Sequence, residues 1–408
     1  MIVVILALLI LVAIIFYGLH NKEEIGSGSI LYSSSNRSSS GRTVLCPYCL
    51  MKTEMSFLNH VCPDCAKEGL TDPEVKRNIR GVYFCKKHNR ACLPHCPNCN
   101  KPLPSVLLEQ GVSNLPFSIV GVTSSGKTNL ITVVLEELGK VEIFDLDTPD
   151  YNTRNKQKEN SRKVYTEHRL LDSTQSGERT PQIWVLKNTK KKLEGHILTS
   201  SFTIFDGAGE DHENKLYDPN DTICKYIAVS ECIILTLDPL ILPGVRNQID
   251  PDRAKQSGYS GEKDSREVVR GLARYIKNLK GMMESQILNI PIAVVLTKFD
   301  LITNLKGFTS NALIKRNGIL LDNNGGSSDW MFNEREATYI HNEIRDWLVH
   351  VGEGRFIAAL EAAFGNYMLF GVSSFGGAPD AKGNLPIIKP HRVLDPFLWI
   401  FHKKGIID

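Results

Sequence analysis

The sequence lacks a clear excess of charge of either sign. Lysine and arginine total 48, aspartate and glutamate total 45, and the net charge over 408 residues is +3. Proteins dedicated to nucleic acid usually carry a marked basic excess, so no nucleic-acid partner is expected. The polar bias of a disordered chain is also absent, because 42% of the residues are hydrophobic and 23% are charged. At about 150 residues per domain, the length predicts roughly two or three folded units.

Charge is also missing from the start of the chain. Residues 2–19 read IVVILALLILVAIIFYGL and contain no charged side chain. A helix of this length spans about 27 Å, close to the hydrocarbon thickness of a bilayer. No basic segment precedes the run and no small-residue cleavage site follows it, which disfavours a cleaved signal peptide. We therefore expect a transmembrane anchor over residues 1–20, with the membrane as a partner.

Residues 21–43 are rich in serine, glycine and asparagine and include the run SSSNRSSSG. This composition is typical of a flexible linker. Basic residues follow the apolar run, whereas none precedes it, so the positive-inside rule places the body of the chain in the cytoplasm. The expected localisation is a single-pass membrane protein. The remaining chain divides into residues 44–102 and 103–408.

Cysteine is nearly absent outside one short segment. Eight of the ten cysteines lie between Cys46 and Cys99. Two C-x-x-C knuckles, Cys46 with Cys49 and Cys62 with Cys65, are separated by 12 residues. Two facing knuckles supply the four thiolates of a structural zinc site, so we expect these two to share one ion. A redox dithiol is the weaker interpretation, because it needs no second pair.

A second set of ligands follows the first. Cys96 and Cys99 form another knuckle, which Cys85 and His88 would complete, with Cys92 as the open alternative to His88. Closed sites with four protein ligands serve folding or docking rather than catalysis. Residues 44–102 are therefore predicted to be a zinc-ribbon module with two Zn²⁺ ions that contacts a protein partner.

Residues 103–408 alternate short apolar runs with helical patterns, which predicts an α/β domain with a doubly wound, mostly parallel sheet. Residues 150–179 are long and polar, and we expect a solvated insertion there. One antiparallel hairpin is expected from Ile183–Leu186 and Ser201–Phe205. The expected parallel strands are Pro116–Val120, Phe202–Phe205, Cys232–Leu237, Ile292–Leu296 and Met368–Val372.

The first motif that carries chemistry lies between a strand and a helix of this pattern. Gly121-Val-Thr-Ser-Ser-Gly126-Lys127-Thr128 follows an apolar run and opens a helical stretch. In this context G-x-x-x-x-G-K-T predicts a P-loop, whose backbone N–H groups surround phosphates at a helix N-terminus. Lys127 would reach the β- and γ-phosphates, and the Thr128 hydroxyl would bind Mg²⁺.

Two further motifs follow at the ends of apolar strands. Asp206-Gly-Ala-Gly209 would place a carboxylate near Mg²⁺ and a backbone N–H near the γ-phosphate. Thr297-Lys298-Phe-Asp300 would read the base, because a carboxylate can accept from both guanine N1–H and the exocyclic amine. Adenine offers neither donor pattern. Lys298 can lie along the ring face, and GTP with Mg²⁺ is the expected ligand.

In this order the motifs resemble those of the translation-factor-related and Ras-like P-loop GTPases. More narrowly, the zinc knuckles and the ending Arg392-Val-Leu-Asp-Pro-Phe-Leu-Trp399 resemble the bacterial double-GTPase group. The resemblance implies a molecular switch that hydrolyses GTP, and a role in a bacterial conflict or defence system. The class has Ser-Ala-Lys in its last loop, where this chain has Ser373 and Ser374 without the lysine. Thr297 also stands where asparagine is commoner.

The catalytic residues are expected to be Lys127, Glu210 and Thr180. Glu210 follows the second motif where small GTPases carry glutamine. Its carboxylate could orient water but would repel the γ-phosphate, so slow turnover is expected. Thr180 is the preferred switch threonine, with Thr174 as the alternative.

The loops around Thr180 and residues 206–211 are expected to contact a protein partner. Two other functions stay open. One is a P-loop enzyme that uses ATP, and the other is a nucleotide-bound scaffold that recruits partners through its zinc ribbons.

Overall fold

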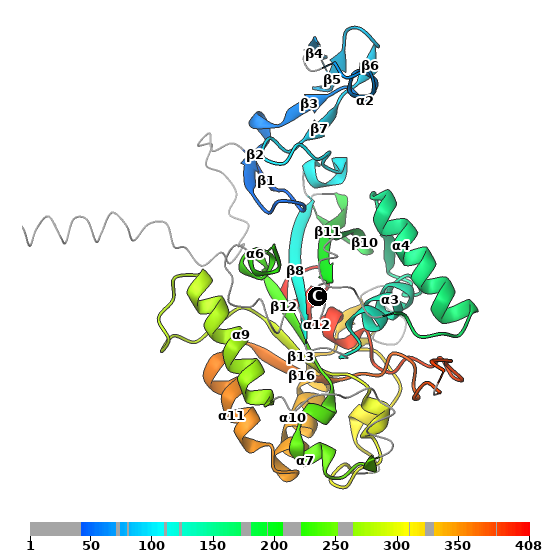
Figure 1. Cartoon of the computed structure of the whole chain (residues 1–408), viewed down its shortest axis with the longest axis vertical. Coiled ribbons are helices and arrows are strands. Elements are labelled where there is room, and N and C mark those ends of the chain that lie inside the picture. The colour runs from blue at the N-terminus through cyan, green and yellow to red at the C-terminus, as the bar shows by residue number, and fades with distance from the viewer. Residues whose placement is uncertain are drawn as a thin grey trace, which may run out of the picture. The chain divides into compact units, whose positions relative to one another are not determined.

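A mixed seven-stranded sheet forms the centre of the larger part of the chain (Figure 1). The fold is that of a computed structural model, which describes residues 42–408 except for 71–73, 80, 110–111, 122–124, 173–180, 194, 207–221, 252–263, 310, 323–329 and 381. The strand order is β16-β13-β12-β8-β11-β10-β9. These strands are β8 (Ser113–Gly121), β9 (Phe144–Asp147), β10 (Gln182–Leu193), β11 (His196–Asp206), β12 (Cys232–Leu237), β13 (Ile292–Leu296) and β16 (Tyr367–Gly371).

Strands β16, β13, β12, β8 and β11 run parallel to one another, whereas β10 is antiparallel to both β11 and β9. The antiparallel hairpin expected from the sequence is confirmed, with Ile183 opposite Thr203. Every residue of β12 and β13 is buried. Burial on both faces explains why these strands read as unbroken apolar runs rather than alternating patterns.

Helices surround the sheet and begin at recognisable caps. The Asp264 side chain accepts from the Arg266 N–H at the start of α9, and Asn333 accepts from the Glu336 N–H at the start of α10. Phe397 and Phe401 of α12 pack against Phe117 of β8 and Phe202 of β11. The helices are α3 (Lys127–Leu138), α4 (Tyr151–Ser161), α6 (Thr222–Val229), α7 (Pro243–Arg246), α9 (Ser265–Leu279), α10 (Glu334–His350), α11 (Gly354–Ala363) and α12 (Asp395–Lys403).

The described part of the cysteine-rich segment consists of short strands, one short α-helix and a 3-10 turn at Met55–Phe57. Strand β3 (Asn59–Val61) pairs with β7 (Leu93–His95) in antiparallel fashion, with Asn59 opposite His95. The other elements are β1 (Thr43–Leu45), β2 (Lys52–Glu54), α2 (Pro63–Lys67), β4 (Val75–Arg77), β5 (Tyr83–Cys85) and β6 (Arg90–Ala91). A two-stranded hairpin elsewhere in the chain comprises β14 (Leu321–Asp322) and β15 (Met331–Phe332).

The expectation of a membrane-spanning helix needs correction. Across the described part of the chain, no helix combines the length and the apolar character that crossing a bilayer requires. This finding overturns the anchor as part of the fold, the membrane as a partner and the single-pass localisation. Residues 1–20, where the anchor was expected, lie outside the described residues.

Candidate functional site

The carboxyl ends of five neighbouring strands meet at one edge of the sheet. Strand β11 ends at Asp206, β8 at Gly121, β12 at Leu237, β13 at Leu296 and β16 at Gly371. The register places Gly121 beside Thr236, and Leu296 beside both Leu237 and Gly371. Open α/β sheets bind ligands at this edge. All the predicted nucleotide motifs therefore start from the same side of the sheet.

The P-loop leaves β8 where only glycine fits. A Cβ atom on Gly121 would lie 2.0 Å from Thr236 Oγ1 and 2.8 Å from Ser125 Oγ. Gly126 has φ +76° and caps the N-terminus of α3, a conformation that glycine adopts without strain. The Lys127 Nζ donates to the Gly121 carbonyl at 3.0 Å, and the lysine is buried. The Lys127 side chain therefore reaches back to Gly121, the residue at which the loop begins.

Thr128 and Asp206 come to the same end of the sheet. Thr128 lies in the first turn of α3, and Asp206 is the last residue of β11, in register with Ile119 of β8. The backbone therefore brings the two residues predicted to bind Mg²⁺ to one edge of the sheet. Gly209, Thr180 and Glu210, with the alternative Thr174, lie outside the described residues.

The base motif begins tightly bound to the neighbouring strand. The Thr297 N–H donates to the Leu237 carbonyl at 3.0 Å, and its hydroxyl donates to the same oxygen at 3.2 Å. Thr297 thus binds β12 rather than reaching toward the P-loop. Lys298 follows with φ +50°. This left-handed residue turns the chain sharply before Asp300.

Ser373 holds the carboxylate that would read the base. Its hydroxyl donates to Asp300 Oδ1 at 2.6 Å and accepts from the Gly376 N–H at 2.9 Å. Among the described residues, nothing donates to Asp300 Oδ2. One oxygen is therefore positioned by the protein, and the other is available to a ligand. Asp300 and Ser373 follow the neighbouring strands β13 and β16, which bring them together although they are 73 residues apart in sequence.

The sequence analysis missed Asp238, which follows β12 directly. Its carboxylate is 2.7 Å from Lys298 Nζ and accepts from the Leu240 N–H at 2.9 Å. Only 2% of the Asp238 side chain is exposed, so the pairing with a cation offsets the cost of burying a carboxylate. An aspartate directly after a buried strand was the available signal, as it was for Asp206. Asp238 thus fixes the position of the Lys298 ammonium within the base motif.

Replacing Ser373 by alanine is expected to weaken binding of GTP by about 5- to 30-fold, or roughly 1–2 kcal/mol. The reason is that Asp300 loses the donor that orients it. Titration with a fluorescent GTP analogue measures the change. Ser285, which is exposed in the loop before β13, provides the matched control. An equal loss in Ser285→Ala and Ser373→Ala would contradict the assignment.

The outer metal group consists of Cys46, Cys49, Cys96 and Cys99, whose sulfur atoms lie within 4.8 Å of one another. Two sulfur–sulfur distances are 3.7 and 3.6 Å. Around a tetrahedral Zn²⁺ with Zn–S near 2.3 Å, adjacent sulfurs are about 3.8 Å apart. A disulfide would be about 2.0 Å. The separations therefore fit a zinc thiolate site.

The inner metal group consists of Cys62, Cys65, Cys85 and His88. The His88 Nδ1 is 3.3 Å from Cys65 Sγ, and its other nitrogen, Nε2, is 3.1 Å from Glu68 Oε1. A carboxylate on the far nitrogen is the usual way in which proteins orient a metal-binding histidine. Burial raises the pKa of the Cys65 thiol to about 12, and a bound cation would favour the thiolate. Cys92 belongs to neither group.

The expected pairing of the knuckles is wrong, although the same eight residues form the two groups. The first knuckle lies with the last, and Cys62 and Cys65 lie with Cys85 and His88. The antiparallel pairing of β3 with β7 is the cause. The residues before β3 therefore lie beside those after β7, which brings the first knuckle to the last. The residues after β3 lie beside those before β7, which brings Cys62 and Cys65 to Cys85 and His88.

Comparison with models of protein families finds no match. One curated relative is the "Putative ESX-1 scaffolding and assembly protein SaeC" of Mycolicibacterium smegmatis, which is 24% identical over 227 residues. The match covers 52% of this chain and 54% of the relative, so the chain spans about half the length of the protein that it matches.

Two solved structures are similar to parts of the chain. The GTPase-like domain of S. cerevisiae Ski7, bound to GDP and inorganic phosphate, has a TM-score of 0.30 and 13% identity, covering 72% of this chain and 51% of that one. Sup35 complexed with GDP has a TM-score of 0.23 and 13% identity, covering 65% and 39%. Because these scores are low, the interpretation of the site rests on its own geometry.

Proposed function

We propose that the chain is a GTPase that binds GTP with Mg²⁺ and hydrolyses it slowly, as a molecular switch. The observation that carries the proposal is the Asp300 carboxylate, held through Oδ1 by Ser373 at 2.6 Å. Its second oxygen is available at the sheet edge from which the P-loop also starts. A carboxylate in this place accepts from the two donors of guanine, whereas adenine would leave it without partners.

Each described residue of the site has a role in this reaction. Lys127 neutralises charge on the β- and γ-phosphates, and Thr128 with Asp206 would hold Mg²⁺. The N-terminus of α3 directs backbone N–H groups at the phosphates. Lys298, fixed by Asp238, lays its aliphatic stem along the base.

The attack on the γ-phosphate is assigned by the sequence alone. Glu210 is the candidate that orients the water and Thr180 the candidate switch residue, and both assignments stay predictions. Membership of the double-GTPase group, with the implied role in conflict or defence, also stays a prediction.

Replacing Lys127 by alanine is expected to weaken GTP binding by roughly a hundredfold, or about 3 kcal/mol, because two charge-assisted contacts to phosphate are lost. Calorimetric titration of the full chain measures the effect. Lys140→Ala is the matched control, since that lysine is exposed at the end of α3 and pairs with Glu137. Equal affinity in wild type and Lys127→Ala would contradict a phosphate site at this loop.

A second candidate is a nucleotide-bound scaffold. The name of the curated relative, a scaffolding and assembly protein, favours it. The two zinc groups would then present a rigid docking surface, and nucleotide would stabilise the fold. Release of phosphate separates the two functions, because a scaffold retains nucleotide at one equivalent per chain without turnover.

A further inference from the structure

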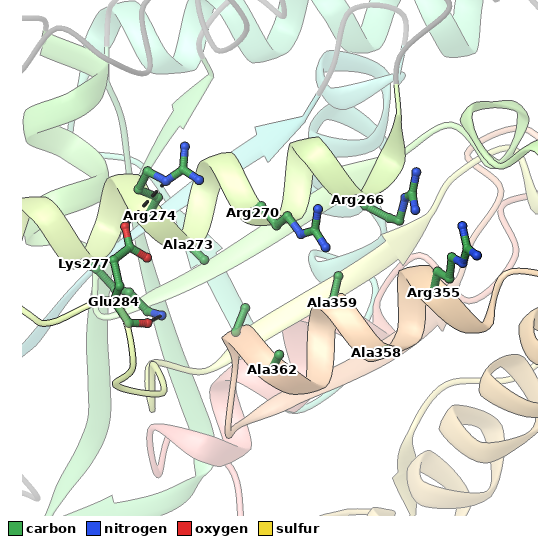
Figure 2. Close-up of a pocket in the computed structure, with 11 residues that line it drawn as sticks. Arg266, Arg270, Ala273, Arg274, Lys277, Glu284, Arg355, Ala358, Ala359 and Ala362 are labelled. Carbon is green, nitrogen blue, oxygen red and sulfur yellow. Dashed lines mark hydrogen bonds and ion pairs between the residues drawn. The ribbon is translucent and has the colours of Figure 1, made fainter.

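A basic groove lies between α9 and α11, neither of which carries a residue of the nucleotide site. Its volume is about 630 Å³. Figure 2 shows Arg266 and Arg355 at one end and Lys277 with Glu284 at the other. The lining residues are Arg266, Arg270, Ala273, Arg274, Lys277, Glu284, Arg355, Ala358, Ala359, Ala362 and Ala363.

The rim of the groove is strongly cationic. Arg266, Arg270 and Arg274 recur at every fourth position of α9, a rise of about 6 Å each time. Among the described residues that line the groove, Glu284 alone is acidic. Arg270 pairs with Glu267 at 3.2 Å and Arg274 pairs with Glu284 at 3.5 Å, and both carboxylates are largely exposed. Ion pairs of this kind are weak, so Arg270 and Arg274 can exchange them for the charges of a ligand, whereas Arg266 is held by Asp264.

The floor of the groove is apolar and shallow. Beyond Arg355, the α11 side presents methyl groups from two pairs of alanines, of which Ala358 and Ala362 are exposed. Small side chains allow the backbone of another helix to approach closely. Met283, directly before Glu284, is 68% exposed, and Ile287, three residues after it, is 49% exposed. Large apolar side chains at the end of a groove are typical of surfaces that anchor a partner.

We propose that the basic groove binds an acidic amphipathic helix of a partner protein. Acidic side chains spaced four residues apart on that helix match the spacing of the arginines, and its small apolar side chains lie on the alanine floor. Single-stranded nucleic acid would need aromatic side chains for base stacking, and the described lining has none. A membrane surface would need several large apolar side chains to insert, whereas the apolar residues that line the groove are all alanines.

The probe is a labelled synthetic helix of about 16 residues, some 24 Å long, with glutamate at every fourth position and alanine and leucine on the other face. Fluorescence anisotropy measures its binding to the full chain. The same peptide with glutamine for glutamate is expected to bind about tenfold more weakly. The double variant Arg270→Glu/Arg274→Glu is expected to lose a similar factor. Lys190→Glu is the control, because it reverses the charge of an exposed residue on β10. It is expected to bind the peptide as the wild type does.

A second variant tests the floor without changing charge. Ala362→Trp fills the groove from an exposed position, so the fold is expected to survive, which circular dichroism checks. It should abolish binding of the glutamate peptide. Unchanged binding in Ala362→Trp would overturn the proposal, because the site would then be only a cationic surface. Failure of the peptide to bind wild type, or equally tight binding of a short single-stranded oligonucleotide, would also overturn it.

Discussion

Asp300→Asn is expected to shift the base preference of the chain from GTP toward XTP. Ser373 can still donate to the amide oxygen, so the side chain keeps its place, but an NH₂ group replaces Oδ2. That group opposes the donors of guanine and suits the 2-carbonyl of xanthine. The mismatch should cost about 2–4 kcal/mol, or roughly 30- to 1,000-fold in affinity for GTP. Parallel titrations with GTP, XTP and ATP measure the shift.

The control for this exchange is Asp346→Asn, the same change at an exposed position of α10. It should leave the preference for GTP intact. Equal binding of ATP and GTP by the wild type would contradict the GTPase and favour an enzyme that uses ATP. An unchanged guanine preference in Asp300→Asn would mean that the base is read elsewhere.

The second large effect concerns the metal groups. We expect two zinc ions per chain, one in each group. Removing them with a chelator under reducing conditions should unfold the cysteine-rich segment, because its buried clusters are small and zinc sites of this kind contribute on the order of 10 kcal/mol to folding. Elemental analysis and limited proteolysis of residues 42–102 provide the measurements.

The cysteines themselves supply a matched pair of variants. Cys65→Ser should lose zinc from the inner group, whereas Cys92→Ser, equally conservative and also buried, should retain both ions. Loss of an ion from Cys92→Ser would show that this cysteine ligates in place of His88. Retention of two ions in Cys65→Ser would contradict the inner group.

Local patterns predicted the elements that depend on neighbouring residues. The apolar runs of β12 and β13 and the strand–loop–helix around Gly126 are set within a few positions of the chain. The polar stretch from residue 150 was expected to be a solvated insertion, yet it contains α4. Gln157 of that helix donates to the Thr132 carbonyl of α3 at 3.2 Å. A helix with so little apolar character gives no periodic signal, because it is positioned by polar contacts.

The spacing of motifs along the chain could not predict which distant residues the fold brings together. Three C-x-x-C knuckles, together with Cys85 and His88, supplied eight metal-binding candidates. Their division into groups depends on which strands pair, and Asn59 lies opposite His95, 36 positions away in the chain. The same holds for Asp238 with Lys298, which neighbouring parallel strands bring together. Their partnership follows from strand order rather than from any motif.

The nested arrangement of the two metal groups also determines how the cysteine-rich segment transmits mechanical tension. A pull on the chain at residues 42 and 103 passes through Cys46, Cys49, Cys96 and Cys99, because these ligands join the two ends of the segment. The inner group and α2 lie within the enclosed loop and carry none of the load. The outer metal–thiolate bonds would have to break before β3 and β7 are separated. With both ions bound, the outer ion would therefore shield the inner group from tension applied through the two ends of the segment.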